Sequence, residues 1–94
     1  MIYRAPLRVD IGEAEQALRG IRRALSSIRP SDRTTRAVAL NNRGVAHEKL
    51  GRAALARCAY RATIPEADRG SEQGIRDTAR ENLSKFDAVL DGDT

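Results

Sequence analysis

Few side chains in this sequence have the chemistry of a catalytic centre, and they are not grouped. His47 is the single histidine, and no second histidine follows His47-Glu48 at the spacing of a zinc protease. Cys58 is the single cysteine, and a turn at Gly51 would bring it near enough to His47 to form a thiolate–imidazole pair. Cys58 falls on an apolar stripe, however, and cysteine is among the most frequently buried residues. We therefore predict a packing role for Cys58.

The acidic residues give no better candidate. Asp87 and Asp91 lie one helical turn apart, but a solvated terminal turn explains such a pair better than acid–base catalysis does. No glycine-rich loop follows a strand, so a nucleotide site has no support. We predict a protein without enzymatic activity, without a bound metal and without a cofactor.

Charge is distributed unevenly along the chain. Residues 1–57 contain twelve basic and five acidic side chains, a net charge of +7, whereas residues 58–94 contain five and eight, a net charge of −3. Fifteen of the 17 basic residues are Arg, and Ala is equally frequent, which indicates a GC-rich genome. The basic half is therefore interpreted first as a solvated surface and second as a binding patch.

Length and composition indicate one small domain with a core of small aliphatic side chains. The three aromatic residues are Tyr3, Tyr60 and Phe86, which favours closely packed helices over a sheet. A single cysteine allows no internal disulfide, and the sequence contains neither a secretory signal nor a stretch long enough to span a membrane. We expect a cytoplasmic protein.

Apolar side chains recur at spacings of three and four along most of the chain, which predicts helices. A capping box begins at Asp10, Ser31 or Asp32 is suited to cap the next helix, and Pro30 and Pro65 are expected to end the helices before them. The predicted segments are an extended N-terminus (1–10), a helical domain (11–91) with helices over about 11–29, 34–50, 52–64 and 74–90 and a polar loop over 66–74, and a frayed tail (92–94).

The two central helices are predicted to form a tight hairpin. Gly51 separates two Ala-rich runs, and glycine is able to adopt a positive φ without strain. Gly44 on the first run then faces Ala56 and Ala59 on the second. Such small side chains allow two helix backbones to approach closely.

Two further apolar stripes require neighbours. Leu55, Cys58 and Ala62 form a second apolar side of the third helix, so we expect that helix to lie between two others. The first helix carries a full stripe from Ala14 to Ile28. The nearby segment 1–9 or another molecule is expected to cover it.

The hairpin also matches a known repeat pattern. The matching residues are Asn41-Asn42-Arg43-Gly44, Leu50-Gly51, Ala56, Tyr60 and Ala62-Thr63. This pattern resembles a tetratricopeptide repeat, with a small residue on the first helix, Gly at the turn, and Ala and an aromatic residue on the second helix. The chain departs from the family pattern at Arg43 and His47, which replace apolar and aromatic residues, at Thr63, which replaces a second Ala, and at Pro65, which arrives early.

Partial copies of the hairpin precede and follow it at constant offsets, as expected of a repeat protein. Upstream, at an offset of 39, Gly12, Ala17, Ile21, Ala24 and Leu25 match Gly51, Ala56, Tyr60, Thr63 and Ile64. Downstream, at an offset of 40, Ala79, Asn82, Leu83, Ser84, Phe86 and Leu90 match Ala39, Asn42, Arg43, Gly44, Ala46 and Leu50. We therefore interpret the chain as a half repeat, a full repeat and a half repeat.

The resemblance implies an all-α fold of four antiparallel helices stacked as a short right-handed solenoid. It also implies a non-enzymatic scaffold or adaptor that binds a peptide or partner protein on the concave surface of its first helices. Asn42 and Asn82 occupy equivalent places there, and paired amides are able to hold a peptide backbone. The expected partner-binding residues are Val38, Asn41, Asn42, Val45, Glu48, Lys49, Thr78, Glu81, Asn82 and Lys85.

Two other interpretations stay open. The turn at Gly51 also resembles a helix-turn-helix, which would make the chain a nucleic-acid-binding protein that uses its basic N-terminal half. Arg52, Arg57 and Arg61 would then lie on the reading helix, although no capping residue follows the glycine. The residues available for phosphate contacts would be Arg19, Arg22, Arg23 and Arg43. The half repeats at the two ends, one basic and one acidic, also predict a homodimer formed through the first helix or end-to-end self-association. We expect no membrane partner.

Overall fold

The computed structural model describes the backbone of residues 7–92 and the side chains of residues 11–85. Four α-helices follow one another: α1 (Leu7–Ser27), α2 (Arg33–Lys49), α3 (Ala53–Arg69) and α4 (Gln73–Gly92). No strand occurs between residues 7 and 92, so the prediction of an all-α chain with four helices is confirmed. No helix in this described part is both long and apolar enough to cross a membrane.

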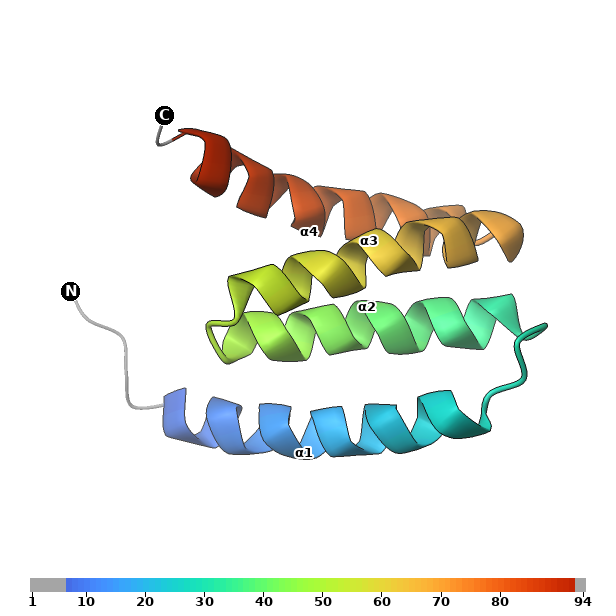
Figure 1. The fold of residues 1–94 in the computed structure, drawn as a ribbon, viewed down its shortest axis with the longest axis horizontal. Coiled ribbons are helices and arrows are strands. Elements are labelled where there is room, and N and C mark those ends of the chain that lie inside the picture. The colour runs from blue at the N-terminus through green and yellow to red at the C-terminus, as the bar shows by residue number, and fades with distance from the viewer. Residues whose placement is uncertain (1–6, 93–94) are drawn as a thin grey trace.

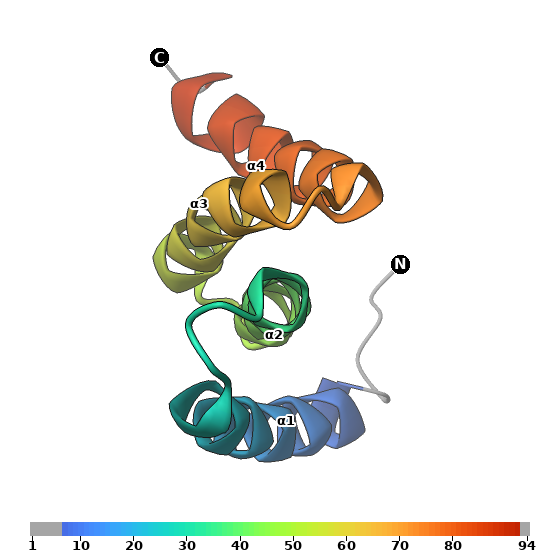
Figure 2. The ribbon, with the colours of Figure 1, turned by 90° about the vertical axis from the view of Figure 1, so that its right-hand side faces the viewer.

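The helices form one stack, and each runs back along the helix before it (Figure 1). Figure 2 shows the same order, from α1 at one end of the stack to α4 at the other. The molecule measures 45 × 32 × 19 Å, so its thinnest dimension is about two helix diameters. α2 contacts all three other helices, whereas α1, over the described residues, contacts α2 alone. One flank of α1 is therefore left without a helical neighbour.

Among the described side chains, small ones make up most of the buried core. Its apolar members are Ala14, Ala37, Ala39, Leu40, Ala46, Ala56, Ala59, Tyr60, Ala67 and Ala79. The fully buried ring of Tyr60 packs directly on Gly44, where an added Cβ atom would lie 2.5 Å from the ring carbon Cε1. The close approach predicted at Gly44 is confirmed, but the side chain nearest to Gly44 is Tyr60 and not Ala56 or Ala59.

The turns after α2 and α3 share one hydrogen-bond pattern, the Schellman motif. The backbone N–H donors and C=O acceptors are Arg52 to His47 (2.9 Å) and Gly51 to Glu48 (3.0 Å) in the first turn, and Glu72 to Ala67 (2.8 Å) and Ser71 to Asp68 (3.2 Å) in the second. The motif requires a left-handed residue at its centre. Gly51 supplies it with φ 74°, as predicted, whereas Ser71 adopts φ 60° with a side chain present.

The start of α1 differs from the prediction, and the start of α2 agrees with it. α1 begins at Leu7, so Asp10 lies inside the helix and does not cap it. A proline directly before a helix is compatible with this start, because the first helical N–H groups need no partner within the helix. Asp32 caps α2, since its carboxylate accepts a hydrogen bond from the Thr35 N–H at 3.2 Å. Residues 1–6 and 93–94, with the side chains of residues 7–10 and 86–92, lie outside the described part.

The prediction that Pro65 ends the third helix is wrong, because α3 continues for four residues beyond it. The added turn is held by tertiary contacts. Glu66 forms ion pairs with Arg33 at 3.3 Å and Arg36 at 3.4 Å, and Ala67 is fully buried. These contacts offset the hydrogen bond that Pro65 cannot donate. The polar loop predicted over residues 66–74 is therefore wrong in extent, because only residues 70–72 lie between α3 and α4.

The second apolar side of α3 is not covered by a helix, which contradicts our expectation. Cys58 and Ala62 are exposed, and Leu55 is 50% exposed. The reason is the position of α1, which packs on α2 and does not reach α3 over the described residues. The predicted packing role of Cys58 is therefore wrong as well.

Candidate functional site

α1 and α2 leave an open, mainly apolar groove of about 640 Å³ between them. Apart from Glu13, the residues of its α1 wall are small or have branched apolar side chains. The residues of its α2 wall recur at spacings of three and four and so lie on one face of that helix. The lining residues are Glu13, Ala14, Ala17, Gly20, Ile21, Ala24 and Ile28 on α1, and Thr35, Val38, Ala39, Asn42, Val45, Ala46 and Lys49 on α2. Val38 is 41% exposed, a large fraction for a valine in a small domain. The groove exists because α1 lacks a second helical neighbour over the described residues.

A second hollow of about 460 Å³ adjoins this groove between α2 and α4. It is lined by Val45, Glu48, Lys49, Tyr60, Asn82 and Lys85. Val45 and Lys49 line both hollows, so the two lie next to each other on one side of α2. We call this combined surface the trough.

The structure brings most of the predicted partner-binding residues to the trough. Val38, Asn42, Val45 and Lys49 line its larger part, and Glu48, Asn82 and Lys85 line its smaller part together with Val45 and Lys49. The remaining three line neither part: Thr78 and Glu81 are exposed on α4, and Asn41 is half-buried. Asn42 lines the larger part of the trough and Asn82 the smaller part.

Glu48 holds the helices together, in addition to lining the trough. Its carboxylate accepts a hydrogen bond from the Tyr60 hydroxyl at 2.7 Å and pairs with Lys85 at 3.2 Å, which joins α2 to α3 and α4. Burial of the Tyr60 phenol, and then its bond to Glu48, raise the pKa of Tyr60 well above its ordinary value. Tyr60 therefore stays neutral and donates to Glu48 at physiological pH.

The predicted partner-binding residues include none of the residues that form the α1 wall of the trough. Ala17, Gly20 and Ala24 belong to it, and all three are exposed. The apolar stripe of the first helix was the available signal, because it marked a face in need of cover. The sequence did not show that this face and the stripe of α2 would form two walls of one groove.

The candidate catalytic residues are placed apart from the trough. His47 and Cys58 both line a small hollow of about 220 Å³ between α2 and α3, but no hydrogen bond joins them in the described part of the chain. Asp87 and Asp91 lie where side chains are not described. Among residues with described side chains, no group of three His, Cys, Asp or Glu is arranged to hold a metal ion.

No protein-family model matches the chain, and neither a curated protein nor a solved structure is significantly similar to it.

Proposed function

We propose that this protein is a non-enzymatic interaction module whose trough binds a helical segment of a partner protein. The observation that carries the proposal is the open trough across α1, α2 and α4, which no helix covers over the described residues. Exposed apolar surface that lines a groove marks binding sites in soluble proteins. An amphipathic helix would bury this surface in the helix-in-groove mode.

The side chains of the trough favour a helix as the occupant. Ala17, Gly20 and Ala24 are small enough for a third backbone to approach α1 closely. The α1 wall extends from Glu13 to Ile28, about 22 Å of helix at 1.5 Å per residue, which corresponds to about four turns of a partner helix. Glu13 and Lys49 add one acidic and one basic group, which suits a partner with both charges beside its apolar stripe.

We further propose that the fold is a short right-handed solenoid of the tetratricopeptide kind. The constant sequence offsets support this proposal, as do the packing of Tyr60 on Gly44 and the two turns with one geometry. The uncovered stripe of α3 is a departure from an extended stack of repeats. We also place the protein in the cytoplasm, because a reducing compartment protects the exposed thiol of Cys58.

The experiment that tests the function starts from the whole chain and a display library of random 16-residue peptides. Enriched peptides are then titrated into ¹⁵N-labelled protein. We expect the amide signals of Val38, Asn42 and Val45 to shift and those of Leu55 and Ala62 to stay in place. A selection that enriches no binder, or shifts confined to the exposed side of α3, would reject the trough as a binding site.

The partner that we propose is alternatively a second copy of the same chain. If two copies pair, we expect them to bury their α1–α2 grooves against each other, because Thr78, Arg80, Glu81 and Ser84 make the described free face of α4 polar. Light scattering after size-exclusion chromatography measures the mass directly. A monomer at high concentration and low salt rules out self-association, and leaves peptide binding to the preceding experiment.

Nucleic-acid binding is less well supported by the arrangement of α2 and α3. These helices lie side by side along their lengths (Figure 1), whereas the helices of a helix-turn-helix cross steeply. Arg52 pairs with Glu15 at 3.3 Å, and Arg57 is half-buried. We expect random-sequence duplex DNA to bind weakly at low salt. Tight binding that falls steeply as salt increases would favour the nucleic-acid alternative.

A further inference from the structure

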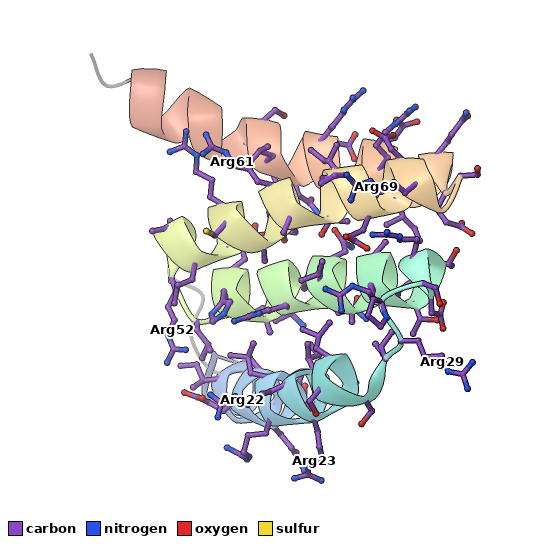
Figure 3. The ribbon with its side chains drawn as sticks, turned by 45° about the vertical axis from the view of Figure 1, so that its right-hand side comes forward. Arg22, Arg23, Arg29, Arg52, Arg61 and Arg69 are labelled. Carbon is purple, nitrogen blue, oxygen red and sulfur yellow. The ribbon has the colours of Figure 1, made fainter. Side chains whose placement is uncertain are left out.

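A second cleft between α1 and α2 shares no residue with the trough and is rich in arginine. It has a volume of about 280 Å³. Its charged lining residues are Arg19, Arg22 and Glu15 on α1, Arg43 on α2 and Arg52 at the α2–α3 turn. Figure 3 shows Arg52 directed from that turn toward α1, where Arg22 lies. Arginines from three separate elements therefore converge on one small space.

The positive charge of this cleft is largely uncompensated. Glu15 is its one acidic lining residue, and it pairs with Arg52 at 3.3 Å. No carboxylate with a described side chain forms an ion pair with Arg19, Arg22 or Arg43. Guanidinium groups donate forked pairs of hydrogen bonds that match the oxygens of a phosphoryl group. The cleft thus has both the charge and the donors for such a group.

His47 forms a buried edge of the cleft. Its side chain is 7% exposed, and its Nδ1 atom is buried without a hydrogen-bond partner in the described part of the chain. Burial lowers the pKa of His47, and the charges of Arg43 and Arg52 lower it further, against a smaller opposite effect of Glu15. The imidazole therefore senses the positive potential of the cleft, and a bound anion would oppose the effect of the arginines.

We propose that the arginine cleft binds a single phosphoryl group, held by Arg19, Arg22 and Arg43 beside His47. A nucleic-acid backbone fits the surface less well, because it needs a track of cations. Among the arginines with described side chains, Arg23 adjoins Arg19 and Arg22 on α1, but Arg23, Arg29 and Arg61 point in different directions from separate elements and do not line up as a track (Figure 3). The phosphoryl group then belongs either to a small phosphate compound or to a phosphorylated side chain of a partner.

The experiment follows the Cε1–H signal of His47, which is unambiguous because the chain has one histidine. The groups that face this imidazole are Glu15, Arg19 and Arg22 from α1, Arg43 from its own helix, Arg52 from the turn and Cys58 from α3. Inorganic phosphate is titrated against sodium chloride at equal ionic strength. We expect phosphate to raise the pKa of His47 saturably by about 0.5 to 1 unit, and chloride to change it much less.

Matched variants distinguish a site from general charge attraction. Arg22→Gln and Arg43→Gln are each expected to weaken phosphate binding at least tenfold. Arg61→Gln removes the same charge from an exposed position outside the cleft and should change it less than twofold. The proposal is overturned if phosphate and chloride act alike, or if Arg61→Gln weakens binding as much as Arg22→Gln does.

A further pair of ligands identifies the source of the phosphoryl group. A short Gly/Ala peptide that carries one phosphoserine is compared with inorganic phosphate, through the same His47 signal. Tighter binding of the peptide by tenfold or more supports a phosphorylated partner, whereas equal affinities support a small phosphate compound. Displacement of phosphate by micromolar duplex DNA would overturn the assignment to a discrete site and support a nucleic-acid surface.

Discussion

At the scale of single residues, Gly44 determines how closely α2 and α3 pack. A side chain at this position would collide with the Tyr60 ring, which is fully buried. The sequence predicted a close approach here because Gly44 faced two alanines. It did not identify Tyr60 as the residue that fills the space, since periodicity places a side chain on a face and does not fix its rotamer.

We predict that Gly44→Ala destabilises the protein by about 1–3 kcal/mol through overpacking, despite the better helix propensity of Ala. Gly20→Ala is the matched control, because it also lies inside a helix and an added Cβ meets nothing within 4 Å. The control should be stabilised by about 0.5–1 kcal/mol. Urea unfolding of both variants measures the difference, and equal effects would contradict the packing of Tyr60 on Gly44.

His47 is expected to make stability depend on pH. Its pKa is lowered in the folded chain, so between the two pKa values the unfolded chain binds the proton and folding loses stability. The free energy of unfolding should therefore decrease as the pH falls below about 6.5, the ordinary histidine value. In His47→Gln this part of the pH dependence should be absent. Urea titrations at pH 7.5 and 5.5 test it, and identical pH dependence in the two proteins would show that His47 does not contribute.

At the scale of elements, the existence of the four helices followed from the sequence, but their ends did not. Helical periodicity is a local property, and it predicted that each of the four helices exists. The end of α3 depends on contacts of Glu66 with the start of α2, more than 30 residues away in the chain. The exposure of Leu55, Cys58 and Ala62 depends likewise on where α1 packs, and an apolar stripe does not indicate which neighbour covers it.

The two Schellman turns give a prediction at this scale. Ser71 adopts the left-handed conformation that Gly51 adopts in the equivalent turn. Ser71→Gly should stabilise the protein by about 1 kcal/mol, because glycine pays no Cβ penalty there. Gly51→Ala is the opposite change at the equivalent position and should destabilise it by a similar amount. Thermal unfolding of both variants is the measurement, and a destabilised Ser71→Gly protein would contradict the assigned turn.

Pro65, inside α3, gives a second prediction at the scale of elements. Pro65→Ala restores one N–H donor inside the helix, so we expect stability to increase by about 1–3 kcal/mol with the end of α3 unchanged. Glu66→Gln in the Pro65→Ala background should keep that end in place, since the helix no longer depends on the ion pairs. Hydrogen exchange of the amides of residues 66–69 measures whether this end of α3 stays in place. Faster exchange in Pro65→Ala than in the parent would contradict this explanation.

At the scale of the whole molecule, the proposed function depends on the trough. Seven of the ten residues that the sequence predicted to bind a partner line the trough, because the stripe on α2 follows from helical spacing. The α1 wall depends on how α1 packs against α2 alone, which no local pattern encodes. Over the described residues the groove is open on the side where no further helix packs against α1, and we propose that a partner covers its apolar lining.

One measurement tests this claim most directly: the affinity of a display-selected peptide for the parent chain, Val38→Glu and Leu55→Glu, by isothermal titration calorimetry. Val38 in the trough and Leu55 on α3 are similarly exposed, at 41% and 50%, so both substitutions should leave the fold intact, as circular dichroism will show. We predict that Val38→Glu weakens binding at least tenfold, because a charge enters the apolar contact, and that Leu55→Glu changes it less than twofold. Equal affinities for the two variants, or a larger loss with Leu55→Glu, would contradict the account.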